Sequence, residues 1–223
     1  MVQSATLRRP DSMHLHLRDD AMLRTALPYS VRHFGRAIVM PNLKPPVTTV
    51  AAGRAYRQRI LDALPQGTTF EPLMTCYLCD GTDQAEIRAG VEERVFTAVK
   101  LYPAGATTHS EYGVTAIDKV ARVLEVMQEF GMPLLIHGES TDPAVDVFDK
   151  EAILLDHTLK HLLKAFPALK VVLEHITTEQ TTDYVWRTPV AGAPRRSHHS
   201  ISFLTEMRCS REDCVRIITV CRF

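Results

Sequence analysis

An alternation of strand-like and helix-like segments runs from residue 14 to residue 185 and constrains the fold of this chain most strongly. Short apolar runs are separated by longer segments of helical periodicity, which is the pattern of parallel βαβ units. The six expected strands cover residues 14–18, 36–42, 69–78, 97–103, 133–139 and 170–175. The sequence therefore predicts an α/β protein with one parallel sheet.

The segments between the expected strands have the spacing of amphipathic helices. Apolar residues recur at intervals of three and four over residues 117–127 and again over residues 155–166, and Pro167 ends the second helix. Six βα units fit either an open doubly wound sheet or a (βα)8 barrel. Because no glycine-rich phosphate-binding motif follows any expected strand, the sequence gives little support to a nucleotide-binding sheet.

Composition narrows the classes of function. Lysine plus arginine and aspartate plus glutamate number 26 each among 223 residues, so no net charge would attract nucleic acid or an anionic membrane. No run approaches the roughly 20 apolar residues of a membrane helix, and the first residues, MVQSATLRRPDS, lack the apolar core of a secretory signal. We therefore expect a cytoplasmic protein with no nucleic-acid or membrane partner and with its five cysteines reduced.

Histidines at the expected strand ends are the main clue to chemistry. His14 and His16 are two residues apart on one strand, so their side chains project to the same face, as a chelating pair requires. His137 and His175 end two later strands, and the carboxyl ends of barrel strands converge on one mouth. A single histidine is more often a core or rim residue, but four converging imidazoles favour a metal site.

Three further residues are candidates for the same mouth. Lys100 lies on a buried-type strand, where it is either a lysine that extends to the surface or a carbamylated lysine that bridges two metals. Arg18 faces the same mouth as His16, and Asn42 ends the second strand. Both could bind an anionic substrate, or they could form a surface salt bridge and a turn, respectively.

The motifs around these residues resemble a known family. The segments DSMHLHLRD, RAIVMPNLKPPVTT, PLMTCYL, FTAVKLYPAGATT, GMPLLIHGE and VVLEHITT are similar, in order and spacing, to the bacterial single-function dihydroorotases of the amidohydrolase superfamily. HxH is shared with hydantoinases, allantoinases and urease, whereas HLHLRD with MPN and KLYPA is specific. The likeness covers residues 8 to about 185 and implies a TIM-type (βα)8 barrel of which about six βα units are present.

The resemblance also implies a site. Two Zn²⁺ ions per subunit would be held by His14, His16, Lys100, His137 and His175. The first two histidines would bind one ion and the last two the other, and Lys100, carboxylated by carbon dioxide, would bridge both ions. Arg18 and Asn42 would bind the substrate carboxylate.

The implied reaction is the reversible ring closure of N-carbamoyl-L-aspartate to L-dihydroorotate in de novo pyrimidine (UMP) biosynthesis. The partner would thus be a small-molecule substrate, and the family resemblance suggests a homodimer. Two alternatives remain. The chain could be another cyclic amidohydrolase, such as a hydantoinase, or a truncated dihydroorotase-like protein without activity that serves as a binding partner.

Residues 186–223 depart from the family pattern. They contain seven arginines, no lysine and three of the five cysteines, and only VRIITVC is strand-like. Back-translating residues 205–223 and reading another frame gives GNAMLAGGLRPHNYCLPV, which looks like the family's next segment. We therefore expect residues 1–185 to form an incomplete (βα)8 catalytic domain and residues 186–223 to be an aberrant, out-of-frame tail.

The metal-binding aspartate that acts as the family's general base is absent from this expected tail. Asp213 lies in SREDC and not at the end of an apolar strand. We therefore expect the chain as written to be inactive and, because an unclosed barrel exposes strand edges, poorly soluble.

Overall fold

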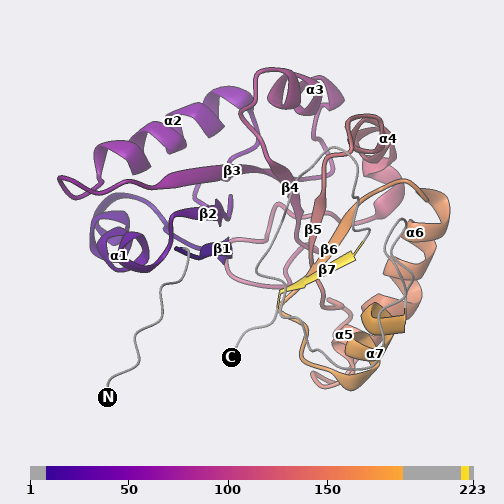
Figure 1. Ribbon diagram of the computed structural model, residues 1–223. Coiled ribbons are helices and arrows are strands. Elements are labelled where there is room, and N and C mark those ends of the chain that lie inside the picture. Colours follow the sequence, from indigo (N-terminus) through magenta and orange to yellow (C-terminus); the bar gives the residue numbers. More distant parts are fainter. Residues whose placement is uncertain (1–8, 188–216, 221–223) are drawn as a thin grey trace, which may run out of the picture.

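The computed structural model describes residues 9–187 and 217–220. These residues form one curved, parallel seven-stranded sheet with strands in the order β1-β2-β3-β4-β5-β6-β7, and the helices lie around its outside (Figure 1). Neighbouring strands in the sheet are also neighbours in the chain, which is the strand order of a (βα)8 barrel. The sheet is therefore a large part of such a barrel, as the sequence predicts.

The strands are short and mostly buried on both faces. Every residue of β4, β5 and β6 is buried, which is why these strands appear in the sequence as continuous apolar runs rather than alternating ones. The strands are β1 (Asp11–Leu15), β2 (Arg36–Val39), β3 (Glu71–Leu78), β4 (Ala98–Leu101), β5 (Leu134–His137), β6 (Val171–Glu174) and β7 (Ile217–Val220).

The helices begin and end where the sequence provides caps. Asp19, Thr49 and Asp83 each accept a backbone N–H in the first turn of the helix that follows. Gly131, with φ 62°, closes the fourth helix in the left-handed conformation. The helical segments are α1 (Asp20–His33), α2 (Val50–Asp62), α3 (Gln84–Glu92), the 3₁₀ turn η1 (Ile117–Val120), α4 (Ala121–Phe130), α5 (Lys150–Leu154), the π-helical turn η2 (Leu155–Leu159), α6 (Lys160–Ala165) and α7 (Glu179–Arg187).

The six strands expected between residues 14 and 175 are all present, but the first expected strand is misplaced. It runs from residue 11 to residue 15 rather than from 14 to 18, so that His16 and Arg18 lie beyond its end. The chain leaves the sheet early because Arg18 takes a left-handed conformation, with φ 59°, and Asp19 caps α1. The two expected helices are confirmed in η1 with α4 and in the α5, η2 and α6 segment, which ends before Pro167.

A seventh strand lies in the segment where we expected an aberrant tail. β7 covers the residues IITV within the strand-like run of the sequence and pairs in parallel with β6, with Ile217 opposite Val171. The expected boundary at residue 185 falls inside α7. Residues 188–216 and 221–223, which make up most of that tail, are outside the described residues, as are Asp213 and the thiols of residues 209, 214 and 221.

The core has two parts, one on each face of the sheet. The larger part packs the outer face against the helices and includes Leu27, Tyr56 and Leu124. The smaller part consists only of residues on or next to strands, namely Ile38, Met40, Ala98, Leu135 and Val172. Because side chains alternate along a strand, this inner cluster shares its face with the residue two positions further along each strand. The inner face of the sheet is therefore apolar in the layer that precedes the carboxyl ends of the strands.

Two features of the described residues bear on the expectations from composition. None of the helices is long and apolar enough to cross a membrane. Cys76, buried on β3, and Cys79, which follows that strand, are both free thiols.

Candidate metal centre and substrate mouth

The four histidines expected at the strand ends lie next to one another. The ring centroids of His14 and His16 are 4.8 Å apart, those of His14 and His175 are 5.5 Å apart, and those of His137 and His175 are 4.6 Å apart. The Nε2 atoms of His14 and His16 face each other at 3.0 Å. Residues from the first, fifth and sixth strands thus bring four imidazoles together at one end of the sheet.

The backbone at His175 is what turns this ring toward the others. Glu174 is the last residue of β6 and points into the sheet interior, so regular alternation would direct the next side chain to the opposite face. His175 instead has φ 43°, in the left-handed region. That conformation costs a residue with a Cβ roughly 1–2 kcal/mol. This backbone strain occurs at the residue whose ring lies beside that of His137.

Burial keeps three of these imidazoles uncharged. Desolvation, with smaller contributions from neighbouring cationic groups, lowers the pKa of His16 to about 3 and that of His137 to about 3. The pKa of His175 falls to about 4 for the same main reason, with Lys100 as the largest charged contributor. A neutral imidazole has one nitrogen lone pair available. These three rings are therefore in the protonation state that metal binding requires.

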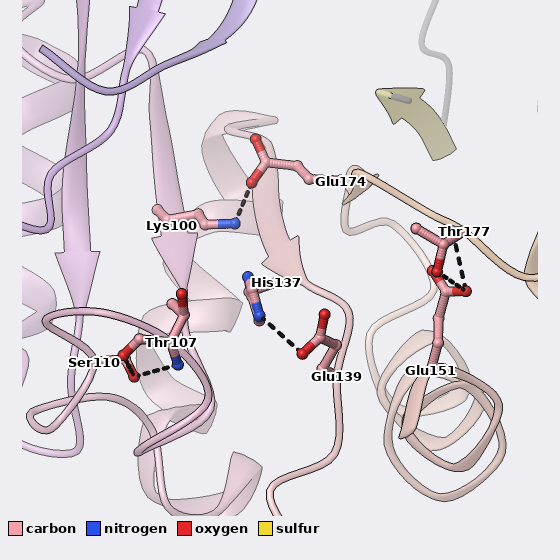
Figure 2. A network of polar contacts seen from close by, with 8 residues as sticks. All are labelled: Lys100, Thr107, Ser110, His137, Glu139, Glu151, Glu174 and Thr177. Atoms are coloured by element: carbon pink, nitrogen blue, oxygen red, sulfur yellow. Dashed lines mark hydrogen bonds and ion pairs between the residues drawn. The ribbon is translucent and has the colours of Figure 1, made fainter. Parts of the chain in front are cut away.

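Lys100 forms an ion pair with Glu174 at the same end of the sheet (Figure 2). Both side chains are completely buried. Burial lowers the pKa of Lys100, and the negative charge of Glu174 opposes that shift. Burial alone would raise the pKa of Glu174, but Lys100 and His14 outweigh it, so this pKa lies below its ordinary value. The sequence left open whether the Lys100 side chain extends to the surface. Its complete burial excludes that possibility.

Sequence reasoning missed Glu174. Its second oxygen, Oε1, lies 3.0 Å from Nδ1 of His14, so one carboxylate contacts two of the candidate ligands. The signal was available in the run VVLEH, because Glu174 is two residues after the inward-facing Val172 and a glutamate at such a position is costly unless it is paired.

Tyr102 is a second residue that the sequence analysis missed. Its ring stacks on Tyr77 with centroids 5.3 Å apart, and the ammonium of Lys100 lies 4.7 Å from the ring centroid. The Tyr102 hydroxyl is buried and has no hydrogen-bond partner among the described residues. Its place in KLYP, two residues after Lys100 on an inward-facing register, could have revealed it.

Several other polar atoms around the histidines are buried without a hydrogen-bond partner in the described part of the chain. They include Nδ1 of His16, Nε2 of His137 and Oδ1 of Asn42. Nε2 of His137 has only a distant neighbour, the Glu139 carboxylate at 3.6 Å (Figure 2). Buried polar atoms are seldom left unpaired, so unpaired ones grouped in one place indicate a ligand or ion. The donor set thus fits a metal, although among residues 9–187 and 217–220 no three His, Cys, Asp or Glu side chains already form a metal-binding arrangement.

Arg18 and Asn42 lie at the same mouth and contact each other. Nη1 of Arg18 donates to the backbone carbonyl of Asn42 at 3.2 Å, and Tyr56 fixes the Arg18 backbone with a 2.8 Å hydrogen bond to its carbonyl. The buried Asn42 side chain donates to the carbonyl of Thr108 at 3.0 Å. The segment after β4 is itself held by Ser110, whose hydroxyl accepts from the Thr107 amide at 2.8 Å (Figure 2).

A cavity between the sheet and its helices is separate from the histidine cluster. It has a volume of about 200 Å³ and is lined by residues that include Leu101, Ile136 and Leu159. Leu101 and Ile136 are neighbours in sequence of Lys100 and His137, and alternation places them on the outer face of the sheet. This cavity therefore does not belong to the histidine cluster.

Curated proteins similar in sequence to this chain include several dihydroorotases. A dihydroorotase from Pectobacterium atrosepticum is 62% identical over 179 residues, which cover 80% of this chain and 52% of that protein. A dihydroorotase from Cereibacter sphaeroides is 58% identical over 202 residues, which cover 90% of this chain and 58% of that protein. The chain thus spans about half the length of the curated relatives it matches. A scan against protein-family models finds no match.

Solved structures agree with the sequence relatives. The crystal structure of a dihydroorotase from Campylobacter jejuni superposes with a TM-score of 0.73 and 39% identity, over 80% of this chain and 51% of that one. A dihydroorotase from Saccharomyces cerevisiae, solved in complex with 5-fluoroorotic acid, gives 0.72 and 33%, over 79% and 50%. An L-hydantoinase from Arthrobacter aurescens, at 0.62 and 12% over 79% and 43%, shares the fold alone.

Proposed function

We propose that this chain, which belongs to the dihydroorotase family, carries the metal and substrate site of a zinc-dependent cyclic amidohydrolase that interconverts N-carbamoyl-L-aspartate and L-dihydroorotate in de novo pyrimidine biosynthesis. The observation that carries the proposal is the convergence of four imidazoles on a buried lysine at the carboxyl ends of parallel strands. Active sites of (βα)8 barrels lie at this end.

The proposed cofactor is a pair of Zn²⁺ ions. His14 and His16 would hold one ion, because their Nε2 atoms converge at 3.0 Å, and His137 and His175 would hold the other. Bound zinc would polarise the substrate carbonyl and activate water. The buried unpaired nitrogens of the cluster support this assignment.

Lys100 would bridge the two ions as a carbamate. Its neutral amine adds to carbon dioxide, so that a bond forms between Nζ and the carbon and one proton leaves to water. The complete burial of Lys100 favours the neutral amine that this step needs. The product carries a negative charge, and its two oxygens could each contact one ion.

Arg18 and Asn42 would bind the carboxylate of the small-molecule substrate. Arginine presents a planar fork of donors that matches a carboxylate, and the amide of asparagine supplies another donor. Both residues are anchored at the same mouth by the hydrogen bonds of Arg18 to Asn42 and of Asn42 to Thr108. The substrate would thus sit with its carboxylate against these two residues and its ring amide toward the histidines.

Further expectations extend this proposal. Residues 1–185 would form the catalytic part of the chain, residues 186–223 would be an out-of-frame tail, and the protein would act in the cytoplasm as a homodimer. The balance of 26 acidic and 26 basic residues supports the absence of a nucleic-acid partner.

Substrate turnover by the purified, zinc-loaded chain tests the function. An active dihydroorotase would hydrolyse L-dihydroorotate but not hydantoin and would rescue a pyrimidine auxotroph, whereas the sequence predicts that the chain as written gives neither turnover nor rescue. Turnover of hydantoin in place of dihydroorotate would make the chain another cyclic amidohydrolase. A folded chain that accumulates in cells without turnover or rescue would instead support a dihydroorotase-like protein without activity.

A further inference from the structure

Glu174 joins two candidate ligands that come from distant strands. Its Oε2 pairs with the ammonium of Lys100 on β4, and its Oε1 lies 3.0 Å from Nδ1 of His14 on β1. Glu174 is the last residue of β6. In the strand order β1-β2-β3-β4-β5-β6-β7, β6 is five positions from β1. The Glu174 carboxylate therefore reaches across the curved inner face of the sheet to contact His14. One fully buried carboxylate thus connects three strands at the centre of the site.

The side of the His14 ring that Glu174 contacts determines what it does. Nδ1 points to the carboxylate, whereas Nε2 points to His16. A carboxylate that accepts the Nδ1 proton fixes the tautomer in which Nε2 keeps its lone pair. Glu174 therefore lies behind His14 relative to the position where a metal would bind, and it acts through this histidine.

We propose that Glu174 is a positioning residue of the metal centre: it fixes the Nε2 tautomer and the ring orientation of His14, and in the metal-free chain it also pairs with the ammonium of Lys100. This inference rests on the proposed function. Once Nζ carries a carboxylate, two negative groups face each other and the pair with Lys100 ends. The 3.0 Å contact of Oε1 with Nδ1 of His14 then remains as the one contact of Glu174 that both states share.

The matched pair of variants is Glu174→Gln and Glu151→Gln. Glu151 is also a buried carboxylate, but it accepts from the backbone amides of Thr177 and Thr178 and contacts none of the candidate ligands (Figure 2). Glutamine keeps the size of the side chain in both variants. The comparison thus separates the loss of a buried charge in general from the loss of the contacts with His14 and Lys100.

Three measurements on the whole chain carry the test. Zinc affinity is measured by competition with a chelator, the Lys100 carbamate by ¹³C NMR in ¹³C-bicarbonate, and the His14 tautomer by ¹⁵N NMR of the metal-free protein. We expect Glu174→Gln to bind zinc 10- to 100-fold more weakly, the range known for partners of metal-ligating histidines. We also expect it to mix the His14 tautomers and to keep the carbamate signal, because the loss of the Glu174 charge favours the neutral amine of Lys100. Glu151→Gln should match the wild type in all three.

Glu174→Asp is the second variant, which decides the question if Glu174→Gln does not fold. It keeps the charge but shortens the reach, so we expect a zinc affinity between those of the wild type and of Glu174→Gln. Wild-type zinc affinity and a single His14 tautomer in the folded Glu174 variants would overturn the role of Glu174 and leave the proposed function standing. A wild-type chain that takes up no zinc would overturn the proposed function itself, and with it the metal-positioning role.

Discussion

Lys100 on β4 and Glu174 on β6 form an ion pair in which neither side chain is exposed to solvent. A buried pair is stabilised by its mutual attraction but pays the desolvation of both charges, so it adds little stability over an apolar pair. Replacing only one residue of the pair is strongly destabilising, because the other charge stays buried without a partner. Lys100 and Glu174, which we assign to the metal centre, therefore also affect the stability of the metal-free chain.

Replacing Lys100 alone should destabilise the metal-free protein. We expect Lys100→Met to lower the free energy of unfolding by about 3–5 kcal/mol, because it leaves the Glu174 carboxylate buried without its cationic partner. The double variant Lys100→Met/Glu174→Gln should lose less than the single variant. Urea unfolding followed by circular dichroism measures both. A loss below about 1 kcal/mol in Lys100→Met would show that the pair is not formed in solution.

Metal content tests the bridging role of Lys100 directly. Lys100→Ala should lose both zinc ions, because no carbamate can form to join them. Lys119→Ala is the control, since Lys119 lies on the surface and pairs with Asp80. Zinc per chain is measured by elemental analysis after gel filtration. Retention of two ions by Lys100→Ala would refute the bridge.

Arg18→Ala should weaken substrate binding more than it slows turnover. A hydrogen bond to a charged group contributes about 1.5–3 kcal/mol, which corresponds to roughly a 10- to 150-fold increase in the dissociation constant of L-dihydroorotate. Titration calorimetry measures that constant. Arg88→Ala, which removes an exposed pair with Glu129, should bind as the wild type does. Equal affinities of the wild type and both variants would show that Arg18 does not bind the substrate and would favour the alternative of a surface salt bridge.

Gly90 should tolerate no side chain. A Cβ at this position would lie 2.3 Å from a ring carbon of Phe96, which is buried between α3 and the sheet. We expect Gly90→Ala to cost about 1–3 kcal/mol, as overpacking of a filled core does. Gly81→Ala is the control, because nothing lies within 4 Å of its Cβ position. Thermal melts of both variants give the comparison, and equal midpoints would mean that Phe96 moves aside freely.

Much of the fold was predictable because the buried strands have a simple signal. Runs such as AVKL and VVLE are apolar apart from one residue, and six strands were located from them. The first strand was misplaced because its bounds depend on the turn at Arg18 and the cap at Asp19, which hydrophobic periodicity does not contain.

The candidate site was partly predictable for a related reason. Strand ends and the two-residue spacing of His14 and His16 were enough to bring the histidines together. The contacts of Glu174 were not predictable in the same way, because its partners on β4 and β1 are distant in sequence and meet only through the curvature of the sheet. The place of Tyr102 likewise depends on its stacking with Tyr77 on the neighbouring strand.

The left-handed turn at His175 has a consequence for protein engineering. It lets two adjacent residues, Glu174 and His175, serve the same site, although a regular strand would send one of them toward the helices. Transplanting this constellation onto another parallel sheet therefore requires copying one backbone torsion as well as the side chains. A graft that keeps ordinary strand geometry through both positions would supply either the orienting carboxylate or the imidazole, but not both.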